Sequence, residues 1–398
     1  MDETIGSIMN QLTFFIDDKL GGVSSLNFNL IKKKPQNLRP LVIHIDNRHD
    51  KMTRAGIDYP GCDQRYFITD DHEHRMNALK RLHKLVPENP GALILNYGTE
   101  MTMLDHFPVL QTTYQLVHDD YNLNLAKKYG HLVDVFICHN THMQKRLLEI
   151  LPNKSNRIFY LPHGIELPSR YREAQAPEKP LRLLFLGRMN RSKGIFDLPQ
   201  IDEILRNNKV NVEWGCIGAG PELQSLKDSW KNDKVRYFSP ETNTEVMDLI
   251  SSYDVFVLPT KFEGSPVSLL ETMAVGLVPV ISKLEGGITD IVDSSVGFTP
   301  GVNDNETFAE SIIKLDNDRN LLETLSKRCR NVIIEKFDLS KTAEKYHELF
   351  GRYEEFYTQK IIQRKRTGFR LDHPMIPSIF TKTIRKNLAF LKNTPKKG

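Results

Sequence analysis

The chain has 398 residues, a length that predicts two domains, because a single hydrophobic core rarely grows beyond about 300 residues. Its composition, 39% hydrophobic with a net charge of +4, suits globular domains, and no apolar run or basic leader indicates a membrane-spanning helix or a signal peptide. The four cysteines lie far apart without a CxxC pair, which argues against a disulfide framework or a metal site and indicates reduced thiols in a cytosolic protein.

The first half of the chain alternates short apolar runs with polar connections, a pattern typical of parallel strands and helices. We expect a first strand over 11–16, then the pair Gly21 and Gly22, then a helix over 23–33. A glycine pair here lets the backbone approach a ligand closely, although an ordinary tight turn is the simpler interpretation. Apolar runs predict further strands at 41–45, 92–96, within 109–117, 133–138 and 157–160.

Several polar residues in this half could be either functional or structural. His118 follows the strand expected within 109–117, at the carboxyl end where open α/β sheets bind ligands, but a structural histidine is an equally good interpretation. The segment 47–75 is polar and irregular, and 47–90 fits no recognisable role. The acidic and histidine-rich run at 70–74 lacks the spacing of a helical metal-binding pair, so we predict no metal site there.

A second series of strands and helices follows residues 166–180, whose three prolines and many charges predict a linker. Its first strand, expected at 181–186, leads into a glycine-bounded loop that holds Arg188 and Lys193. Arginine as a forked donor and lysine as a point charge suit a diphosphate, whereas two basic residues in a loop are by themselves usually a solvated surface. Further strands are expected at 211–217, 235–238, 255–258 and 278–281, with helices from about 305 to 335 and from 340 to 360.

The stretch 255–271 combines a buried strand, a loop and the start of a helix. We expect Ser265 to cap this helix and Pro266 to occupy its first position. The next two backbone amides then have no partner inside the helix and favour an anion. Two carboxylates, Glu263 and Glu271, bracket the helix tip. This stretch therefore indicates an anion site flanked by groups that bind hydroxyls.

The ordered motifs resemble those of GT-B glycosyltransferases, specifically the retaining enzymes of glycosyltransferase family 4. Each motif is weak alone, but six of them in order, each at a strand end, are not expected by coincidence. The resemblance covers about residues 10 to 355 and implies two doubly wound Rossmann-like domains that face a cleft. The set comprises Gly21-Gly22, His118-Asp119, His163-Gly164, Gly187-Arg188 to Lys193-Gly194, Gly218-x-Gly220-Pro221 and Glu263-x7-Glu271.

The resemblance implies that the second domain binds a nucleotide-sugar donor and that the acceptor binds mainly to the first domain. It implies no metal ion and no cofactor. The catalytic candidates are Glu263 and His118: Glu263 is a candidate by its charge, although the resemblance makes it a partner for sugar hydroxyls, and the resemblance places His118 beside the donor sugar. By the same resemblance, the diphosphate is bound by Arg188 and Lys193, and the ribose hydroxyls are bound by Glu271. The sugar and the nearer phosphate are held by Glu263 and by the backbone of Gly264, Ser265, Pro266 and Val267. The phosphates are also approached by Gly21 and Gly22.

The expected reaction is retaining, metal-independent transfer of a hexose-type sugar to a glycan or lipid-linked acceptor in surface polysaccharide biosynthesis. A UDP-sugar is the first candidate donor and GDP-mannose the second. Attack on the same face, with the leaving phosphate as base, is preferred because no residue is an evident nucleophile. Alternatives on the same fold are an epimerase, a phosphorylase with a lysine-bound pyridoxal cofactor, and a non-catalytic sugar-nucleotide-binding protein.

The expected organisation is an acceptor-binding domain over 1–165, the linker 166–180, a donor-binding domain over 181–340, a helix over 341–360 that packs on the first domain, and a basic tail over 361–398. The tail holds ten Lys and Arg residues against one acid, so the rest of the chain is net negative. Its apolar residues recur at helical spacing with basic residues between them: Ile376, Ile379, Phe380, Ile384, Leu388 and Leu391, with Lys382, Arg385, Lys386 and Lys392.

This basic amphipathic pattern predicts a helix that lies on an anionic membrane surface. A helix packed on the protein's own body is an almost equal alternative. Nucleic-acid binding is not expected, because aromatic residues are sparse among the basic ones. We therefore expect a cytoplasmic protein that associates peripherally with the inner face of the cell membrane.

Overall fold

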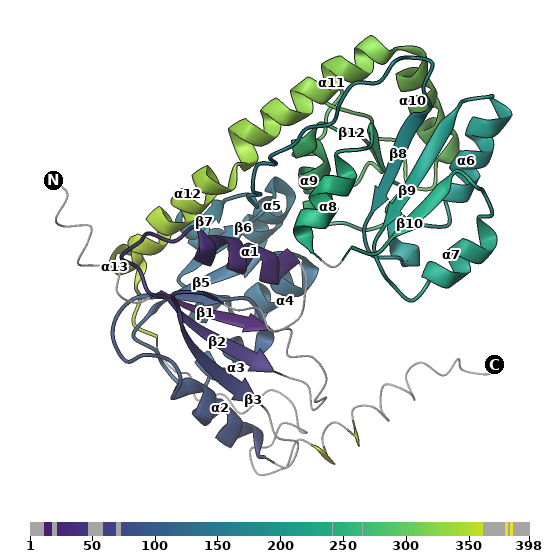
Figure 1. The fold of residues 1–398 in the computed structure, drawn as a ribbon. Helices are drawn as coiled ribbons and strands as arrows, with labels where there is room; N and C mark the ends of the chain where they lie inside the picture. Colours follow the sequence, from purple (N-terminus) through teal and green to yellow (C-terminus); the bar gives the residue numbers. More distant parts are fainter. Residues whose placement is uncertain are drawn as a thin grey trace. The chain divides into compact units, whose positions relative to one another are not determined.

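The structure, a computed structural model, describes residues 12–17, 22–46, 59–68, 73–240, 242–264, 266–360, 379–380 and 383–384. The chain divides into two compact units, which are described one by one (Figure 1). Unit 1 comprises Met1–Cys138, Arg146–Phe159 and Ala343–Gly398, and unit 2 comprises His139–Lys145 and Tyr160–Thr342.

Unit 1 is built on a seven-stranded sheet in the order β3-β2-β1-β4-β5-β6-β7, in which the pairings from β3 through β6 are parallel. The strands are β1 (Leu12–Asp17), β2 (Leu41–Asp46), β3 (Asp63–Ile68), β4 (Ala92–Leu95), β5 (Thr112–Val117), β6 (Val135–Cys138) and β7 (Ile158–Tyr160). The helices between them are α1 (Gly22–Lys32), α2 (Arg75–His83), α3 (Gly98–Leu104), α4 (Asp120–Tyr129), η1 (Gly130–Leu132), α5 (Thr141–Ile150) and η2 (Pro152–Arg157).

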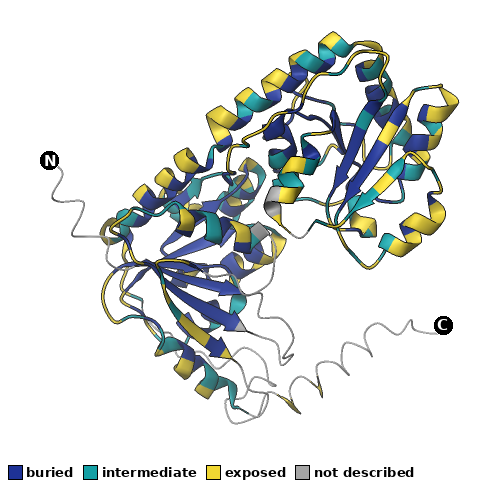
Figure 2. Cartoon of the chain, in the orientation of Figure 1, coloured by how far each residue is buried: buried dark blue, intermediate teal, exposed yellow. Residues whose placement is uncertain are grey.

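The inner strands of unit 1 are buried along their whole length, as Figure 2 shows for β1 and β5. A parallel sheet covered on both faces requires such continuous apolar runs, which is why the sequence pattern locates these strands. The edge strand β3 is different, because Phe67 is buried while Tyr66 and Ile68 are exposed. It lies in the segment 47–75, for which we predicted no strand, and its polar, half-exposed sequence is the physical reason for that error.

The C-terminal part of the chain packs on unit 1. It consists of α12 (Leu339–Gly351), which begins at the end of unit 2, and the short helix α13 (Tyr353–Phe356). The Tyr114 hydroxyl of β5 donates to the Leu349 carbonyl at 3.0 Å. Beyond α13, Lys360 forms an ion pair with Asp134 at 2.7 Å, and the two side chains are only 3% and 1% exposed. A buried charge pair of this kind fixes the position of the segment, since either partner alone would be an uncompensated buried charge.

Unit 2 contains a five-stranded parallel sheet in the order β10-β9-β8-β11-β12. Its strands are β8 (Leu181–Leu186), β9 (Val212–Ile217), β10 (Val235–Phe238), β11 (Val255–Leu258) and β12 (Val278–Ile281). Its helices are η3 (Arg191–Lys193), α6 (Leu198–Asn207), α7 (Leu223–Ser229), α8 (Asn243–Ile250), α9 (Val267–Val275), α10 (Asn305–Asn317), α11 (Arg319–Val332) and η4 (Ile333–Phe337).

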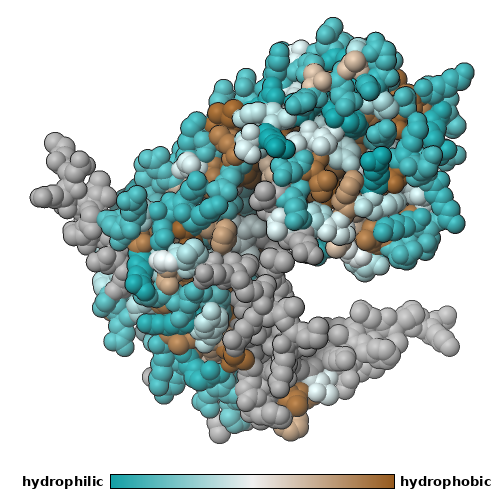
Figure 3. Space-filling view, viewed as in Figure 1, coloured by the Kyte–Doolittle hydropathy of each residue, from teal (hydrophilic) through white to brown (hydrophobic). Residues whose placement is uncertain are grey.

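The strand order of unit 2 repeats that of β3-β2-β1-β4-β5 in unit 1, with a reversal beside the first strand of each series. This is the doubly wound arrangement, and it confirms the predicted pair of Rossmann-like domains. The predicted cleft between them stays a prediction. The core of unit 2 is apolar, while its visible surface is mainly hydrophilic (Figures 2 and 3).

Two buried carboxylates organise unit 2. Asp202 accepts hydrogen bonds from the indole nitrogens of Trp214 and Trp230, at 2.9 and 3.1 Å. Asp254 is fully buried and paired with Arg172 at 2.9 Å and Arg182 at 2.8 Å, and these partners hold its pKa below the ordinary value despite burial. Arg172 lies in the segment expected as a linker, so this buried ion pair anchors that segment to the body of unit 2.

The predicted tail 361–398 lies mostly outside the described residues. Residues 379–380 and 383–384 are helical, and Ile379, Phe380 and Ile384 are exposed. Within the described ranges, no helix combines the length and the apolar character that crossing a membrane requires.

Candidate functional site

The loop that follows β8 carries the predicted diphosphate ligands. Arg188 is exposed, and its side chain makes no hydrogen bond or ion pair with any described residue. Asn190 caps the short helix η3 by accepting from the Lys193 amide at 3.2 Å. Gly194 then adopts φ +70°, and a Cβ there would lie 1.8 Å from the Pro259 carbonyl oxygen. The loop is therefore pressed against the end of β11, a packing that only glycine permits at this position.

The loop after β11 is hydrogen-bonded to the loop after β8. The Lys261 amide donates to the Ser192 carbonyl at 2.8 Å, and the Thr260 hydroxyl lies 3.1 Å from that carbonyl oxygen. These contacts bring Lys193 close to Glu263, which is 70 positions away in the sequence. The Lys193 ammonium forms an ion pair with the Glu263 carboxylate. The side chains are 24% and 10% exposed, so the pair is only partly accessible to water.

Gly264 continues this loop and joins two further segments of unit 2. Its carbonyl oxygen accepts from the Gly287 amide at 3.1 Å and from the Asn140 side chain at 3.4 Å. Sequence motifs did not single out Asn140. Its neighbour Thr141 donates from its amide and from its hydroxyl to Asp290, at 2.6 and 2.5 Å. The loop that carries Glu263 is thus supported on several sides.

Helix α9 begins at Val267, with Pro266 as its N-cap. This corrects the prediction that Pro266 occupies the first helical position: its φ of −71° suits a helix but its ψ of 105° is extended. Ser265, the predicted cap, lies outside the described residues. The amides of Val267 and Ser268 make no hydrogen bond with the described part of the chain, and the first helical bond is that of Leu269 to Pro266. Two open amides at the positive end of the helix dipole favour an anion.

Glu271 lies in the second turn of α9 and is partly buried. Its carboxyl group makes no hydrogen bond or ion pair with a described residue. Burial without a partner raises its pKa from 4.5 to about 7. A half-buried carboxyl group with a perturbed pKa and no partner among the described residues, in the second turn of a helix with open amides, is a candidate ligand-binding group.

The remaining predicted residues lie in unit 1. Gly21 lies outside the described residues, and Gly22 is the first residue of α1. His118 follows β5 and is partly buried, with its Nε2 atom 3.2 Å from the side-chain oxygen of Asn96. Asn96 follows β4 in the same way as His118 follows β5. The sequence rule that selected His118, a polar residue at the carboxyl end of a buried strand, would also have selected Asn96.

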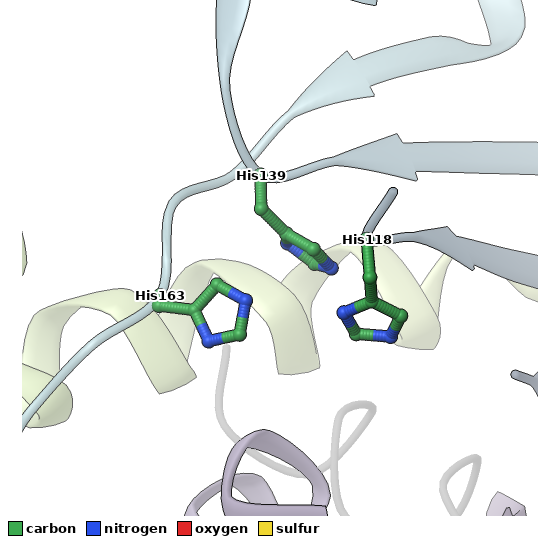
Figure 4. A group of neighbouring side chains, drawn as sticks. All are labelled: His118, His139 and His163. Atoms are coloured by element: carbon green, nitrogen blue, oxygen red, sulfur yellow. The ribbon is translucent and has the colours of Figure 1, made fainter. Parts of the chain in front are cut away.

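Figure 4 draws His118 with two histidines of unit 2, His139 and His163. The rings of His139 and His163 meet edge to face, with their centroids 4.5 Å apart. Burial lowers the pKa of His139 to about 4 and that of His163 well below its ordinary value, so both rings are neutral at physiological pH. His139 Nδ1 donates to the Leu161 carbonyl at 3.1 Å, which fixes its tautomer.

Comparison with known proteins identifies the family to which the chain belongs. Residues 169–332, inside unit 2, match the model of the family described as glycosyl transferases group 1. The amylovoran biosynthesis glycosyltransferase AmsK of Erwinia amylovora is 30% identical over 369 residues, which cover 77% of this chain and 86% of AmsK. The UDP-Gal:alpha-D-GlcNAc-diphosphoundecaprenol alpha-1,3-galactosyltransferase of Escherichia coli is 28% identical over 151 residues, which cover 37% of this chain. The chain spans only 39% of the length of that second relative.

Among solved structures, Anabaena Alr3699/HepE in complex with UDP and glucose superposes with a TM-score of 0.68 at 14% identity, covering 86% of this chain and 99% of that one. At this identity the likeness concerns the fold. The family follows from the match to AmsK over most of both chains, together with the match of unit 2 to the family model. The chain belongs to the group 1 glycosyltransferases, which have the GT-B fold and are of the family 4 type.

Proposed function

We propose that the protein is a retaining, metal-independent glycosyltransferase. It moves a hexose-type sugar from a nucleotide-sugar donor to a glycan or lipid-linked acceptor in surface polysaccharide biosynthesis. The observation that carries the proposal is the grouping, at the carboxyl ends of β8 and β11, of two basic residues, two carboxyl groups and two open helix amides. The UDP-Gal donor in the name of the Escherichia coli relative favours a UDP-sugar, with GDP-mannose as the second candidate.

In this proposal the diphosphate of the donor binds between Arg188, Lys193 and the amides of Val267 and Ser268. Arg188 is unpaired within the described ranges, so it can meet a phosphate without losing a protein partner. Lys193 shares its charge with Glu263, which holds the ammonium group near the helix tip. Glu271 accepts from the ribose hydroxyls, a role that suits a carboxylate with no donor in the part of the chain that the structure describes.

The chemistry follows from where charge develops. Breaking the bond from the sugar C1 to phosphate leaves negative charge on the diphosphate and positive charge on the sugar. Fixed cations and amides aimed at the diphosphate stabilise that charge without reorganisation, and they supply the positive charge that a metal ion would otherwise supply. The ion pair with Lys193 favours Glu263 as a group that holds sugar hydroxyls over Glu263 as a nucleophile. We therefore propose attack on the same face as departure, with the leaving phosphate as base.

Unit 1 is proposed to bind the acceptor, and its His118 is proposed to contact the donor sugar. The E. coli relative's name contains a diphosphoundecaprenol acceptor, which supports a lipid-linked acceptor here.

The test is a turnover assay on the full chain with a panel of nucleotide sugars and polyprenyl-diphosphate sugars. We expect nucleoside diphosphate release that requires an acceptor, continues in EDTA, and gives a product whose anomeric configuration, read by NMR, is that of the donor. An inverted product or loss of turnover in EDTA contradicts the mechanism. Conversion of the donor without any acceptor indicates the epimerase alternative, and binding without turnover indicates the non-catalytic one.

The exposed tail residues support a second part of the proposal, association with an anionic membrane surface. Phe380 is 61% exposed and Ile384 is 41% exposed, and the surrounding sequence is rich in Lys and Arg. Apolar side chains beside basic ones match the interface of an anionic bilayer. We expect the full chain to sediment with anionic vesicles but not with neutral ones, and Phe380→Glu with Ile384→Glu to abolish this. Equal sedimentation of wild type and variant would show that the tail is not the membrane contact.

A further inference from the structure

We propose that Asn96 is a positioning residue that fixes the ring orientation and the tautomer of His118. In the neutral ring, Nε2 then carries the proton and Nδ1 carries the lone pair. The inference rests on the proposed function, in which His118 contacts the donor sugar, and it adds a residue to that site.

The direction of the Asn96 amide is set by the backbone of β1. Asn96 is 1% exposed, and its side-chain nitrogen donates to the Phe15 carbonyl at 2.8 Å. A carbonyl oxygen only accepts hydrogen bonds, so the amide nitrogen must face Phe15 and the amide oxygen must face away from it. That oxygen lies 3.2 Å from His118 Nε2. Because the amide oxygen also only accepts, His118 Nε2 must donate.

The backbones of both residues are held by side chains of the neighbouring helices α3 and α4, which fixes the positions from which the two side chains project. The backbone amide of Asn96 donates to Glu100 of α3 at 2.7 Å, and its backbone carbonyl accepts from the Asn122 side chain of α4 at 2.8 Å. The side-chain oxygen of Asn122 accepts from the His118 amide at 3.2 Å. Glu100 is fully buried, and Asn122 is almost so, which fixes these partners in place.

The chemical consequence concerns what His118 can do at its other nitrogen. A ring with its proton on Nε2 accepts a hydrogen bond at Nδ1 and does not donate there. A flipped Asn96 amide would place its oxygen against the Phe15 carbonyl oxygen and lose that hydrogen bond, and it would turn an NH2 group toward Nε2, which would favour the opposite tautomer. The Phe15 carbonyl of β1 thus sets the tautomer of the His118 ring through the Asn96 side chain.

The test reads the tautomer directly. The full chain is labelled with 15N-histidine, and long-range 1H–15N correlation spectra are recorded at a pH where the ring is neutral. The His118 signals are those that disappear in His118→Gln. We expect the Nε2–H form in the wild type and in Asn96→Asp, which keeps an acceptor toward the ring. In Asn96→Leu, which removes the acceptor, we expect the Nδ1–H population to rise at least several-fold.

Asn27→Leu is the matched control. Asn27 is a fully buried asparagine of the same unit, and its amide donates to Val23 without contacting His118. We expect this variant to keep the wild-type tautomer. Asn96→Ala replaces Asn96→Leu in the event that the leucine variant does not fold.

A wild-type ring protonated on Nδ1, or an unchanged tautomer in the variants that lack the acceptor, overturns the inference. Turnover separates this outcome from failure of the proposed function. We expect Asn96→Leu to lose about tenfold or more in kcat and Asn96→Asp to recover part of it. A changed tautomer with unchanged turnover would leave the positioning intact and remove His118 from the proposed mechanism.

Discussion

Replacing Glu271 by glutamine is predicted to stabilise the protein at alkaline pH while it weakens donor binding. Burial raises the pKa of Glu271 from 4.5 to about 7, and no partner in the described part of the chain compensates the charge. One pKa unit corresponds to 1.36 kcal/mol, so this difference makes the ionised carboxylate cost up to about 3 kcal/mol in the folded protein. Because the side chain keeps some contact with water, we expect a gain of about 1 to 3 kcal/mol in Glu271→Gln.

The sign of the pH dependence follows from linkage. The folded-state pKa lies above the unfolded value, so the folded form is not penalised below about pH 4.5, where the group is neutral in both states. The penalty grows as pH rises from 4.5 through 7 and is complete above that. The stability gain of Glu271→Gln should therefore be absent near pH 4.5 and full at pH 8.

Urea unfolding followed by tryptophan fluorescence measures this effect in the right place, since both tryptophans of the chain, Trp214 and Trp230, lie in unit 2. Glu310→Gln, at an exposed position of α10, controls for the loss of one negative charge. Calorimetric titration with UDP should show about a tenfold weaker affinity for Glu271→Gln, because a neutral amide replaces the carboxylate that we propose to bind the ribose. A variant that is less stable than wild type at pH 8, or equally changed at both pH values, would refute the reasoning.

Three further substitutions test other parts of the account. Lys193→Ala should raise the Kd for UDP about 10 to 100-fold, since a charge-assisted hydrogen bond contributes roughly 1.5–3 kcal/mol. As the control, Lys231→Ala, at an exposed position, should change the Kd little in the same titration. Asp254→Ala should lower the free energy of unfolding by about 3 to 5 kcal/mol in urea, because it leaves two arginines without their buried partner; a loss under 1 kcal/mol would contradict this. Gly194→Ala should cost at least about 2 kcal/mol in the same assay, given its positive φ and the contact with Pro259, and an unchanged stability would show that the loop is not packed as described.

The sequence located the strands that are buried on both faces, because those strands need continuous apolar runs. It failed at β3, whose polar residues suit an edge exposed to water. Arg172 and Asp254 show a second limit: charges and prolines at 166–180 resemble a linker, yet one of those charges is buried in an ion pair across 82 positions. Local composition does not reveal a partner that distant.

In the candidate site too, sequence motifs point to individual residues, whereas the contacts between those residues depend on the tertiary structure. The motifs predict Lys193 and Glu263 as separate ligands, but only the packing of two loops reveals that they form an ion pair. Asn96 escaped notice because an asparagine at a strand end has many uses, and its contact with His118 depends on the register of β4 beside β5. Glu271 was identified by spacing, whereas the burial that raises its pKa follows from the tertiary structure.

The most direct test of the central claim, a diphosphate site at the tip of α9 in unit 2, is isothermal titration calorimetry of the full chain with UDP, GDP and the matching monophosphates. We predict that at least one nucleoside diphosphate binds, that its monophosphate binds at least tenfold more weakly, and that Lys193→Ala removes most of this difference. No binding of either diphosphate, or equal affinity for diphosphate and monophosphate, would contradict the claim.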